Sequence, residues 1–227
     1  MAAAARYAVR MKSYGQFCSV ARALDLLGER WTLLVVRELL MGSKSFGDLR
    51  RGIPRISRTM LSARLRELKD GGVIAPVDGG YELTRAGREL ESVVVALGTW
   101  GQRWLARATP DDELDLDALV WDMHRRVAAL PTRPVVVRIE ATDLRRARPR
   151  FLLLRDGEVS LCTTNPGFAE SLTVRADRAV LVGWWRGDFD LAAARRRGLA
   201  LDGPPALVRA FASWFSRYLF ASVPPAA

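Results

Sequence analysis

The sequence predicts two domains: a mainly α-helical domain in residues 1–107, and an α+β domain with a largely antiparallel sheet in residues 118–227. A chain of 227 residues is long enough for two domains of about 100 residues each. Apolar residues recur at helical spacing in the first half, whereas short β-prone runs between turn residues dominate the second. The polar, acidic segment 108–117 is the predicted linker.

Charge is spread unevenly between the two halves. Residues 1–107 carry 18 Lys or Arg and 10 Asp or Glu, a net charge of +8, whereas residues 108–227 carry 17 and 15, a net charge of +2. This asymmetry indicates that the first half binds a polyanion and that the second half has a different function.

Composition argues against several classes of protein. Two cysteines, Cys18 and Cys162, are too few for a disulfide scaffold, and no apolar run approaches the roughly 20 residues of a membrane span. The N-terminal residues lack the apolar stretch of a signal peptide, so we expect a cytoplasmic protein with no membrane partner. With a single histidine, His124, and no P-loop, dinucleotide fingerprint or nucleophile elbow, we expect no enzyme, no metal site and no cofactor.

The first half is predicted to fold as three helices, a turn, a longer helix, a hairpin and a last helix. Ser45 and Asp48 form a capping-box pattern, and Ser57 is a favourable N-cap. The predicted segments are 19–28, 31–41, 45–52, 58–70, a hairpin around 78–80 and a helix from residue 85 onward. A short and a longer helix joined by a tight turn form a helix-turn-helix, and the hairpin after them is a wing.

Basic charge gathers at this predicted helix-turn-helix, because residues 44–66 carry seven Lys or Arg against one Asp, a net charge of +6. The start of the second helix of such a motif enters the major groove of DNA. We therefore predict that Arg58, Thr59, Ser62 and Arg66 contact base edges or flanking phosphates. The other predicted DNA-binding residues, which would hold the backbone from the turn and the wing, are Lys44, Ser45, Arg55, Ser57, Tyr81 and Arg85. The alternative is that these side chains form solvated faces.

The second half is predicted to begin with a helix from Leu116 to Leu130, which prolines 131 and 134 end. Strands are expected at 135–142, 150–155, 159–163, 172–175 and 199–201, and helices at 177–186, 190–197 and 205–220. His124 is expected at the surface. Aromatic-rich concave sites suit hydrophobic ligands, and the predicted ligand-pocket residues are Trp121, Phe151, Trp184, Trp185, Phe189, Phe211, Trp214 and Phe215. The alternative is that these rings form only a core.

The first half resembles the HxlR family of winged-helix regulators, relatives of the MarR type. The resemblance runs from about residue 15 to 104 and rests on CSVARALDLLGERWTLLVVRELL (18–40), FGDLRRGIPRISRTMLSARLREL (46–68) and YELTRAGREL (81–90). It implies a homodimer joined through its terminal helices, with Val94, Leu97, Trp100 and Trp104 packing across the dimer axis. It also implies operator DNA with two-fold symmetry.

Cys18 lies where some members of that family carry an oxidant-sensing cysteine. A helix N-terminus, with Arg22 one turn further on, would lower the pKa of its thiol. The alternative is a small buried residue at the start of a helix. Two features depart from the family pattern: Ser19 replaces the proline that usually follows this cysteine, and the wing is short.

The second half is similar to sterol-carrier-protein type-2-like domains. The residues that carry this resemblance are LTVRAD (172–177), WRGDFDLAAARRRGLALDG (185–203) and FASWF (211–215). It implies an apolar tunnel for lipid-like molecules.

These observations favour a DNA-binding transcriptional regulator, more specifically a repressor that responds to a hydrophobic small molecule in its C-terminal domain. A second hypothesis keeps the regulator but makes oxidation of Cys18 the trigger. A third is a lipid-binding carrier protein with a vestigial DNA domain, and a fourth is an architectural dimer whose second domain only binds a protein.

Overall fold

The computed structural model describes residues 13–105, 109–129, 131–144 and 148–226. The chain divides into two compact units, residues 1–98 (unit 1) and 99–227 (unit 2), and the division falls inside one helix. The boundary expected from the sequence lies later, at residue 107. Among the described residues, no helix has the length and apolar character needed to cross a membrane.

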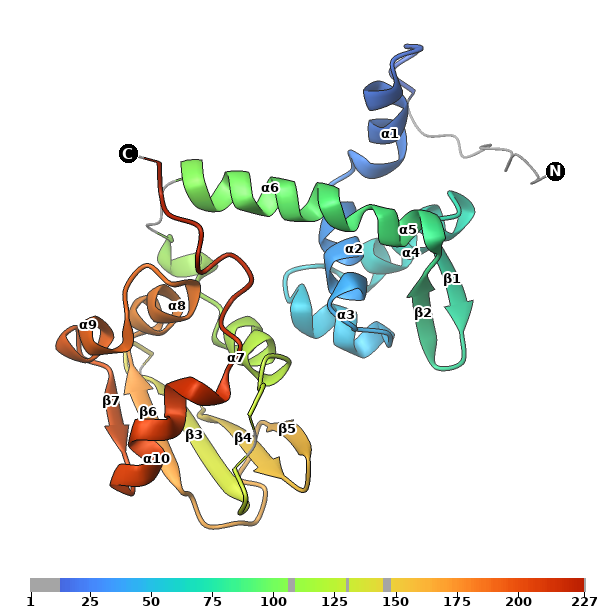
Figure 1. Ribbon diagram of the computed structural model, residues 1–227. Helices are drawn as coiled ribbons and strands as arrows, with labels where there is room; N and C mark the ends of the chain where they lie inside the picture. The colour runs from blue at the N-terminus through green and yellow to red at the C-terminus, as the bar shows by residue number, and fades with distance from the viewer. Residues whose placement is uncertain (1–12, 106–108, 130, 145–147, 227) are drawn as a thin grey trace. The chain divides into compact units, whose positions relative to one another are not determined.

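Unit 1 is a winged helix-turn-helix, as predicted (Figure 1). Its helices are α1 (Ser19–Leu27), α2 (Thr32–Leu40), α3 (Phe46–Gly52), α4 (Arg58–Asp70), α5 (Arg85–Glu89) and α6 (Glu91–Trp104), the last of which continues into unit 2. The wing is an antiparallel hairpin of β1 (Ile74–Val77) and β2 (Gly80–Leu83). The helix expected from residue 85 onward is interrupted at Leu90, so α5 and α6 are separate.

Side-chain caps fix where three of these helices begin. The hydroxyl of Ser45 accepts a hydrogen bond from the backbone N–H three residues further on at 3.0 Å, and the hydroxyl of Ser57 does the same at 3.1 Å. Thr84 caps α5 in the same way at 3.2 Å. Each such cap stabilises its helix by about 1 kcal/mol. Since the capping residue and its partner are only three residues apart, the first residues of α3 and α4 can be predicted from local sequence.

One apolar core holds unit 1 together, and it joins α2, α3 and α4 to the wing. Its buried members are Val35, Val36, Leu39, Leu49, Ile53, Ile56, Leu61, Leu65, Leu68, Val73, Ile74 and Leu83. Along α4 the buried apolar positions are Leu61, Leu65 and Leu68, at i, i+4 and i+7, so the opposite face of this helix is left to solvent.

The wing is held against the loop before α3 by its backbone. The N–H of Tyr81 donates a hydrogen bond to the carbonyl oxygen of Lys44 at 3.1 Å. Gly80 lies so close to that carbonyl that a Cβ atom on it would be 2.2 Å from the oxygen. At the base of the wing, the hydroxyl of Thr84 donates to the carbonyl oxygen of Gly72 at 2.7 Å. The wing is therefore tied to its surroundings at both ends.

Unit 2 is an α+β structure whose helices and sheet share one core. Its helical elements after α6 are the 3-10 turn η1 (Asp111–Glu113), α7 (Leu116–His124), α8 (Arg178–Arg186), α9 (Leu191–Arg196), α10 (Pro205–Ala210) and the 3-10 turn η2 (Phe211–Trp214). Its strands are β3 (Val135–Ala141), β4 (Arg150–Arg155), β5 (Glu158–Cys162), β6 (Leu172–Ala176) and β7 (Ala200–Asp202). Within the expected linker 108–117, Leu114 and Leu116 are already buried.

The sheet has the order β5-β4-β3-β6-β7. The pairs β3–β4, β4–β5 and β6–β7 are antiparallel, which confirms a largely antiparallel sheet. The central pair β3–β6 is parallel, because the chain passes through β4 and β5 on one side of β3 before it returns on the other. The sequence did not predict this crossover.

Two predicted helices are shorter than expected, and one long-range contact explains both. The α7 helix ends at His124, and the helix expected over 205–220 ends as η2 at Trp214. Val127 and Phe215 then form an antiparallel bridge, and the backbone N–H of Ala128 donates to the carbonyl oxygen of Trp214 at 2.7 Å. Both segments leave helical geometry in order to pair. Leu130, the expected end of the first helix, lies outside the described residues.

Gly80→Ala is expected to destabilise unit 1 by roughly 1–3 kcal/mol, because its methyl group would overlap the carbonyl group of Lys44. Urea unfolding of the full chain, followed by circular dichroism, measures this. Gly47→Ala is the matched control, since the nearest atom to its Cβ is 3.6 Å away and alanine favours a helix interior by up to about 1 kcal/mol. Equal unfolding midpoints for the two variants would contradict the predicted close approach.

Candidate nucleic-acid interface and effector site

The exposed face of α4 brings together the four residues predicted to read DNA. Arg58, Thr59, Ser62 and Arg66 are all exposed, opposite the buried leucine stripe of the helix. Arg55 is also exposed and lies in the turn that joins α3 to α4. Arginine can bond guanine with two hydrogen bonds, while hydroxyl side chains accept several partners. This face therefore has the chemistry of a DNA-reading surface.

Two predicted DNA-binding serines have a structural role. The hydroxyl of Ser45 caps α3 and also donates to Asp48 Oδ2 at 2.8 Å, while that of Ser57 caps α4. Both residues fix the N-terminal ends of the helix-turn-helix helices. Because the partial positive charge of a helix lies at that end, these positions also suit backbone contacts to phosphate.

Part of the basic charge in this segment is already neutralised. Arg64 is buried and forms ion pairs with Glu67 and with Glu29, the latter at 3.4 Å. Arg51 Nη1 lies 2.9 Å from Asp48 Oδ1. The net charge of +6 that the sequence assigns to residues 44–66 therefore overstates the positive charge that is available to contact DNA.

Of the predicted DNA-contacting residues on or beside the wing, Tyr81 and Lys44 already make contacts within the protein. Tyr81 is half-buried against the core of unit 1. Lys44 Nζ lies 2.6 Å from Glu82 Oε1, and the hydrogen bond and charge of Lys44 lower the pKa of the Glu82 carboxyl. Arg85, with 92% of its side chain exposed, reaches Glu89 only at 3.4 Å and remains accessible. Sequence reasoning missed Glu82, because its partner lies 38 residues away in the chain.

A buried carboxylate, which sequence reasoning also missed, positions α3 against α2. Glu38 is fully buried, and its Oε1 accepts from Arg37 Nη2 at 2.7 Å. Ser43 Oγ donates to Glu38 Oε2 at 3.3 Å, and Arg37 Nη2 also donates to the carbonyl oxygen of Gly52, the last residue of α3. The only sequence signal was an adjacent pair of opposite charges, Arg37 and Glu38, inside a helix that is otherwise almost entirely apolar.

A stripe of exposed apolar residues runs along α6, which has no buried residue. Its members Val93, Leu97, Trp100 and Trp104 are all exposed, at i, i+4, i+7 and i+11. The sequence placed Val94 in this stripe, but Val94 packs against the core of its own unit, and Val93 takes the exposed position. Exposed apolar stripes of this kind are typical of protein interfaces.

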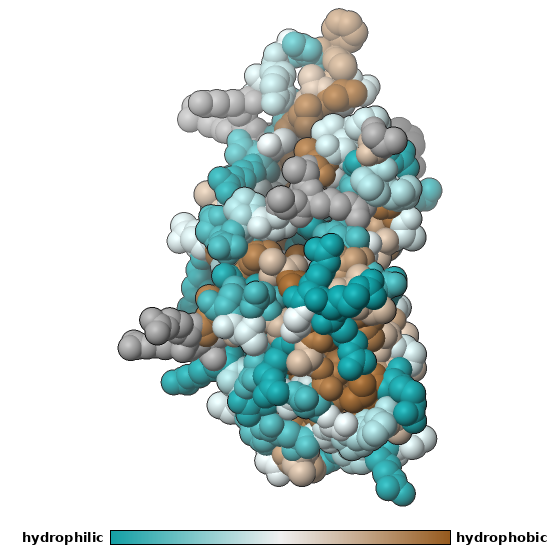
Figure 2. Space-filling model, turned by 90° about the vertical axis from the view of Figure 1, so that its left-hand side faces the viewer, coloured by the Kyte–Doolittle hydropathy of each residue, from teal (hydrophilic) through white to brown (hydrophobic). Residues whose placement is uncertain are grey.

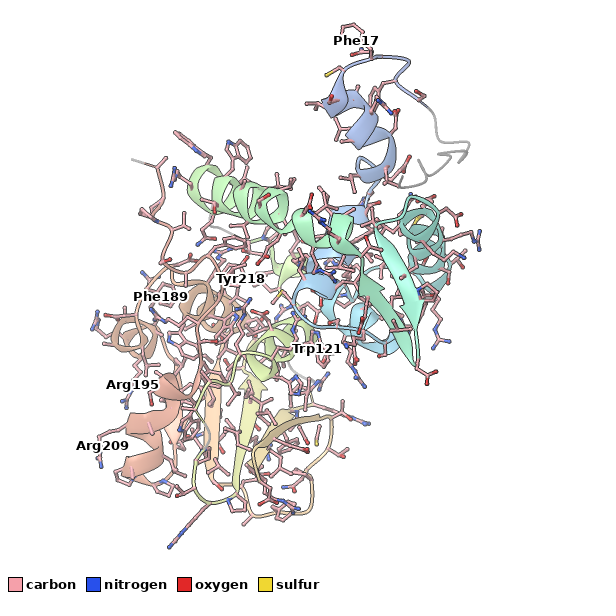
Figure 3. All side chains as sticks on the ribbon, turned by 45° about the vertical axis from the view of Figure 1, so that its right-hand side comes forward. Phe17, Trp121, Phe189, Arg195, Arg209 and Tyr218 are labelled. Atoms are coloured by element: carbon pink, nitrogen blue, oxygen red, sulfur yellow. The ribbon has the colours of Figure 1, made fainter. Side chains whose placement is uncertain are left out.

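A second apolar face lies on and just before α1. Phe17 is fully exposed, and Val20 and Leu24 follow it at helical spacing with 66% and 41% exposure. Figure 2 shows apolar side chains at the surface in the topmost part of the molecule, which Figure 1 labels α1. Figure 3 shows Phe17 beyond the end of this helix.

Cys18 adjoins this apolar face as the N-cap of α1, and its thiol is exposed. The backbone N–H groups of Ala21 and Val20, at the start of α1, lower the pKa of the thiol, because they stabilise the thiolate. Cys162, at the end of β5, is a half-buried free thiol. The first cysteine therefore combines access with thiolate character.

Five of the predicted pocket residues pack on one another in the core of unit 2. Trp184 stacks on Phe211 with ring centroids 5.4 Å apart, and Phe211 meets Trp214 and Phe215 edge-on at 5.9 and 5.4 Å. Trp185 meets Phe215 edge-on at 5.6 Å. We call these five rings the aromatic cluster.

The other three predicted pocket residues pack elsewhere. Trp121 stacks on His124 at 5.1 Å, Phe151 lies beneath the guanidinium of Arg138, and Phe189 lies beneath that of Arg197. His124 is half-buried, with Nε2 lying 3.0 Å from a carbonyl oxygen of β5, so its predicted surface position is wrong.

A cavity of about 760 Å³ lies in unit 2 away from the predicted pocket residues. Its described lining is Asp112, Leu114, Asp115, Leu116, Asp117, Leu144, Arg148, Arg150, Thr163, Thr164 and Arg178, and includes none of the eight predicted aromatic residues. Two of these arginines already have partners: Arg150 pairs with Asp117, and Arg178 pairs with Asp143.

A helix-turn-helix with an exposed basic face and a docked wing defines unit 1 as a DNA-binding unit of the winged-helix class. Residues 26–109 match the family described as HxlR-like helix-turn-helix. The chain is 45% identical over 96 residues to the uncharacterised HTH-type transcriptional regulator Rv3095 of Mycobacterium tuberculosis, an alignment that covers 39% of this chain and 60% of that protein. The chain thus spans less than two thirds of this relative.

Two further proteins show the same likeness. The HTH-type transcriptional regulator YdeP of Bacillus subtilis is 35% identical over 97 residues, covering 40% of this chain and 76% of its own. The crystal structure of quinone-bound YodB from B. subtilis is 35% identical, covers 37% of this chain and 96% of its own, and has a TM-score of 0.34. The chain belongs to the HxlR-like helix-turn-helix family of transcriptional regulators.

Alkylation of Cys18 by iodoacetamide, in a Cys162→Ser chain, is expected to reach half its maximal rate below the free-thiol pKa of about 8.5. The pH profile of alkylation should shift to lower pH, because the lowered pKa lets the thiolate form at lower pH in the folded protein. The same chain unfolded in urea is the control, since it loses the helix N-terminus that stabilises the thiolate. Identical pH profiles for the folded and unfolded chain would contradict this prediction.

Proposed function

We propose that this protein is a repressor that binds operator DNA as a homodimer and releases it when a hydrophobic small molecule binds the second unit. The observation that carries the DNA-binding part is the exposed face of α4, where Arg58, Thr59, Ser62 and Arg66 lie opposite a buried leucine stripe. Caps at Ser45 and Ser57 fix the two helices that present this face.

The apolar stripe of α6 supports a homodimer. Val93, Leu97, Trp100 and Trp104 expose a continuous apolar edge, which a second copy would cover. A two-fold dimer presents two copies of α4, and these would read half-sites about one helical turn, roughly 34 Å, apart on the operator.

The second unit is the proposed sensor, in a sterol-carrier-like role. Its support is an aromatic cluster of large size next to a sheet of mostly apolar residues. These rings pack on one another, so an apolar ligand would have to separate them. A ligand shifts DNA affinity only if it binds the DNA-free form more tightly than the bound form.

Oxidation of Cys18 is the second candidate trigger. Its support is the exposed thiol with a lowered pKa at the start of α1, beside an apolar face. A carrier protein with a vestigial DNA domain would not bind DNA, and an architectural dimer would not bind a small-molecule ligand. DNA binding and ligand binding are therefore tested separately.

Arg58→Ala and Arg66→Ala are each expected to weaken binding to the protein's own promoter DNA by about 1–3 kcal/mol, through loss of base or phosphate contacts. Fluorescence anisotropy over a range of salt concentrations measures this, and sedimentation should give two chains per duplex. Arg195→Ala is the control, because this exposed arginine lies on α9 of unit 2 (Figure 3). The proposal fails if the wild type shows no specific binding at moderate salt, or if all three variants behave alike.

Palmitate, as a probe of the hydrophobic-ligand proposal, is expected to add its mass to the full chain in native mass spectrometry and to release promoter DNA. It should also change tryptophan emission, because Trp184, Trp185 and Trp214 lie in the aromatic cluster. Cys18→Ser separates the two triggers: it should leave release by palmitate unchanged and abolish any release by diamide. No added mass and unchanged emission would remove the proposed sensor role.

A further inference from the structure

The ion pair between Lys44 and Glu82 joins the wing to the loop before α3. Lys44 Nζ lies 2.6 Å from Glu82 Oε1, with 62% and 47% of the two side chains exposed. The same corner is fixed by the backbone hydrogen bond from Tyr81 to Lys44, and the two backbones touch at Gly80. The two charged groups are thus held together by a rigid junction and not only by their own attraction.

Lys44 stands where a cation could meet DNA. It immediately precedes Ser45, the N-cap of α3, and its ammonium group is open to solvent. A lysine in this basic helix-turn-helix segment would add a phosphate contact if its charge were available.

The wing itself carries acidic charge and no basic charge. Residues 72–84 contain Asp78 and Glu82 but no Lys or Arg, and both carboxylates are exposed. A carboxylate near DNA repels phosphate, and it also competes with phosphate for any cation it holds. Arg88, the other cation that acts on Glu82, donates to the carbonyl oxygen of Leu83 at 2.7 Å and so is committed within the fold.

We propose that Glu82 sets how tightly the helix-turn-helix holds DNA, by keeping the Lys44 ammonium group from the DNA phosphates. This inference rests on the proposed DNA-binding function and identifies a residue that limits it. Each lysine that neutralises a phosphate releases counterions and steepens the fall of log K with log salt by about 0.9. A lysine that remains paired with a carboxylate gains little of this effect.

Glu82→Gln is the direct test, since it removes the charge and keeps the size of the side chain. With a non-specific DNA duplex, the slope of log K against log salt should steepen by about 0.9 per chain. The affinity per chain should rise about eightfold at 0.1 M salt, with the value extrapolated to 1 M unchanged. Lys44→Gln alone should change the slope by much less, because the ammonium group is already paired.

Two controls separate this effect from a general change of charge. Asp70→Asn makes the same change of net charge at the exposed C-terminal end of α4, away from Lys44, and should leave the slope close to that of the wild type. Glu82→Gln in a Lys44→Gln chain should lose the steepening, because no ammonium group is released. Glu82→Thr, which suits a strand, repeats the test, and thermal melting verifies that each variant is folded.

The outcomes separate this inference from the function on which it rests. The inference is overturned if Glu82→Gln matches the wild type or Asp70→Asn, or if its effect survives in the Lys44→Gln chain. It is also overturned if Lys44→Gln alone removes a full unit of about 0.9 from the slope, because Lys44 then already contacts phosphate. A wild type without salt-dependent DNA binding would overturn the proposed function as well.

Discussion

The arrangement of the helix-turn-helix depends on one buried carboxylate. Glu38 is removed from solvent, and a buried charge is tolerated only when donors surround it. Arg37 and Ser43 supply these donors, and Arg37 also holds the carbonyl oxygen at the end of α3. Gly52 leaves the necessary space, since a Cβ atom there would be 1.9 Å from Glu38 Oε2. The position of α3, and through it that of the turn before α4, is therefore fixed from inside α2.

Local features of the fold could be predicted because their physics is local. The caps at Ser45 and Ser57 act over three residues, and the neighbouring strands expected at 150–155 and 159–163 form as β4 and β5, within one residue of the expected bounds. Features that depend on distant partners could not. The helix expected to run on to residue 220 ends early because Phe215 pairs with Val127, which is 88 residues earlier in the chain. No helical periodicity carries that information.

The same distinction applies to the candidate sites. Helical spacing was enough to place Arg58 and Arg66 on the exposed face of α4. The sequence counted Arg64 in the same basic segment, but this side chain is buried and paired with Glu29 and Glu67. Aromatic content predicted a cluster in unit 2, yet whether such rings line a pocket or fill a core depends on packing, which a list of residues does not contain.

The close approach of Gly80 to the Lys44 carbonyl has a consequence for local unfolding. The Tyr81 amide is held by that carbonyl, so it can exchange its hydrogen with solvent only when the wing separates from the loop before α3. Wing and loop should therefore open as one cooperative unit, with a common exchange free energy. A displacement of the wing would then be transmitted directly to the first turn of α3, because the wing is in contact with the loop that precedes this helix.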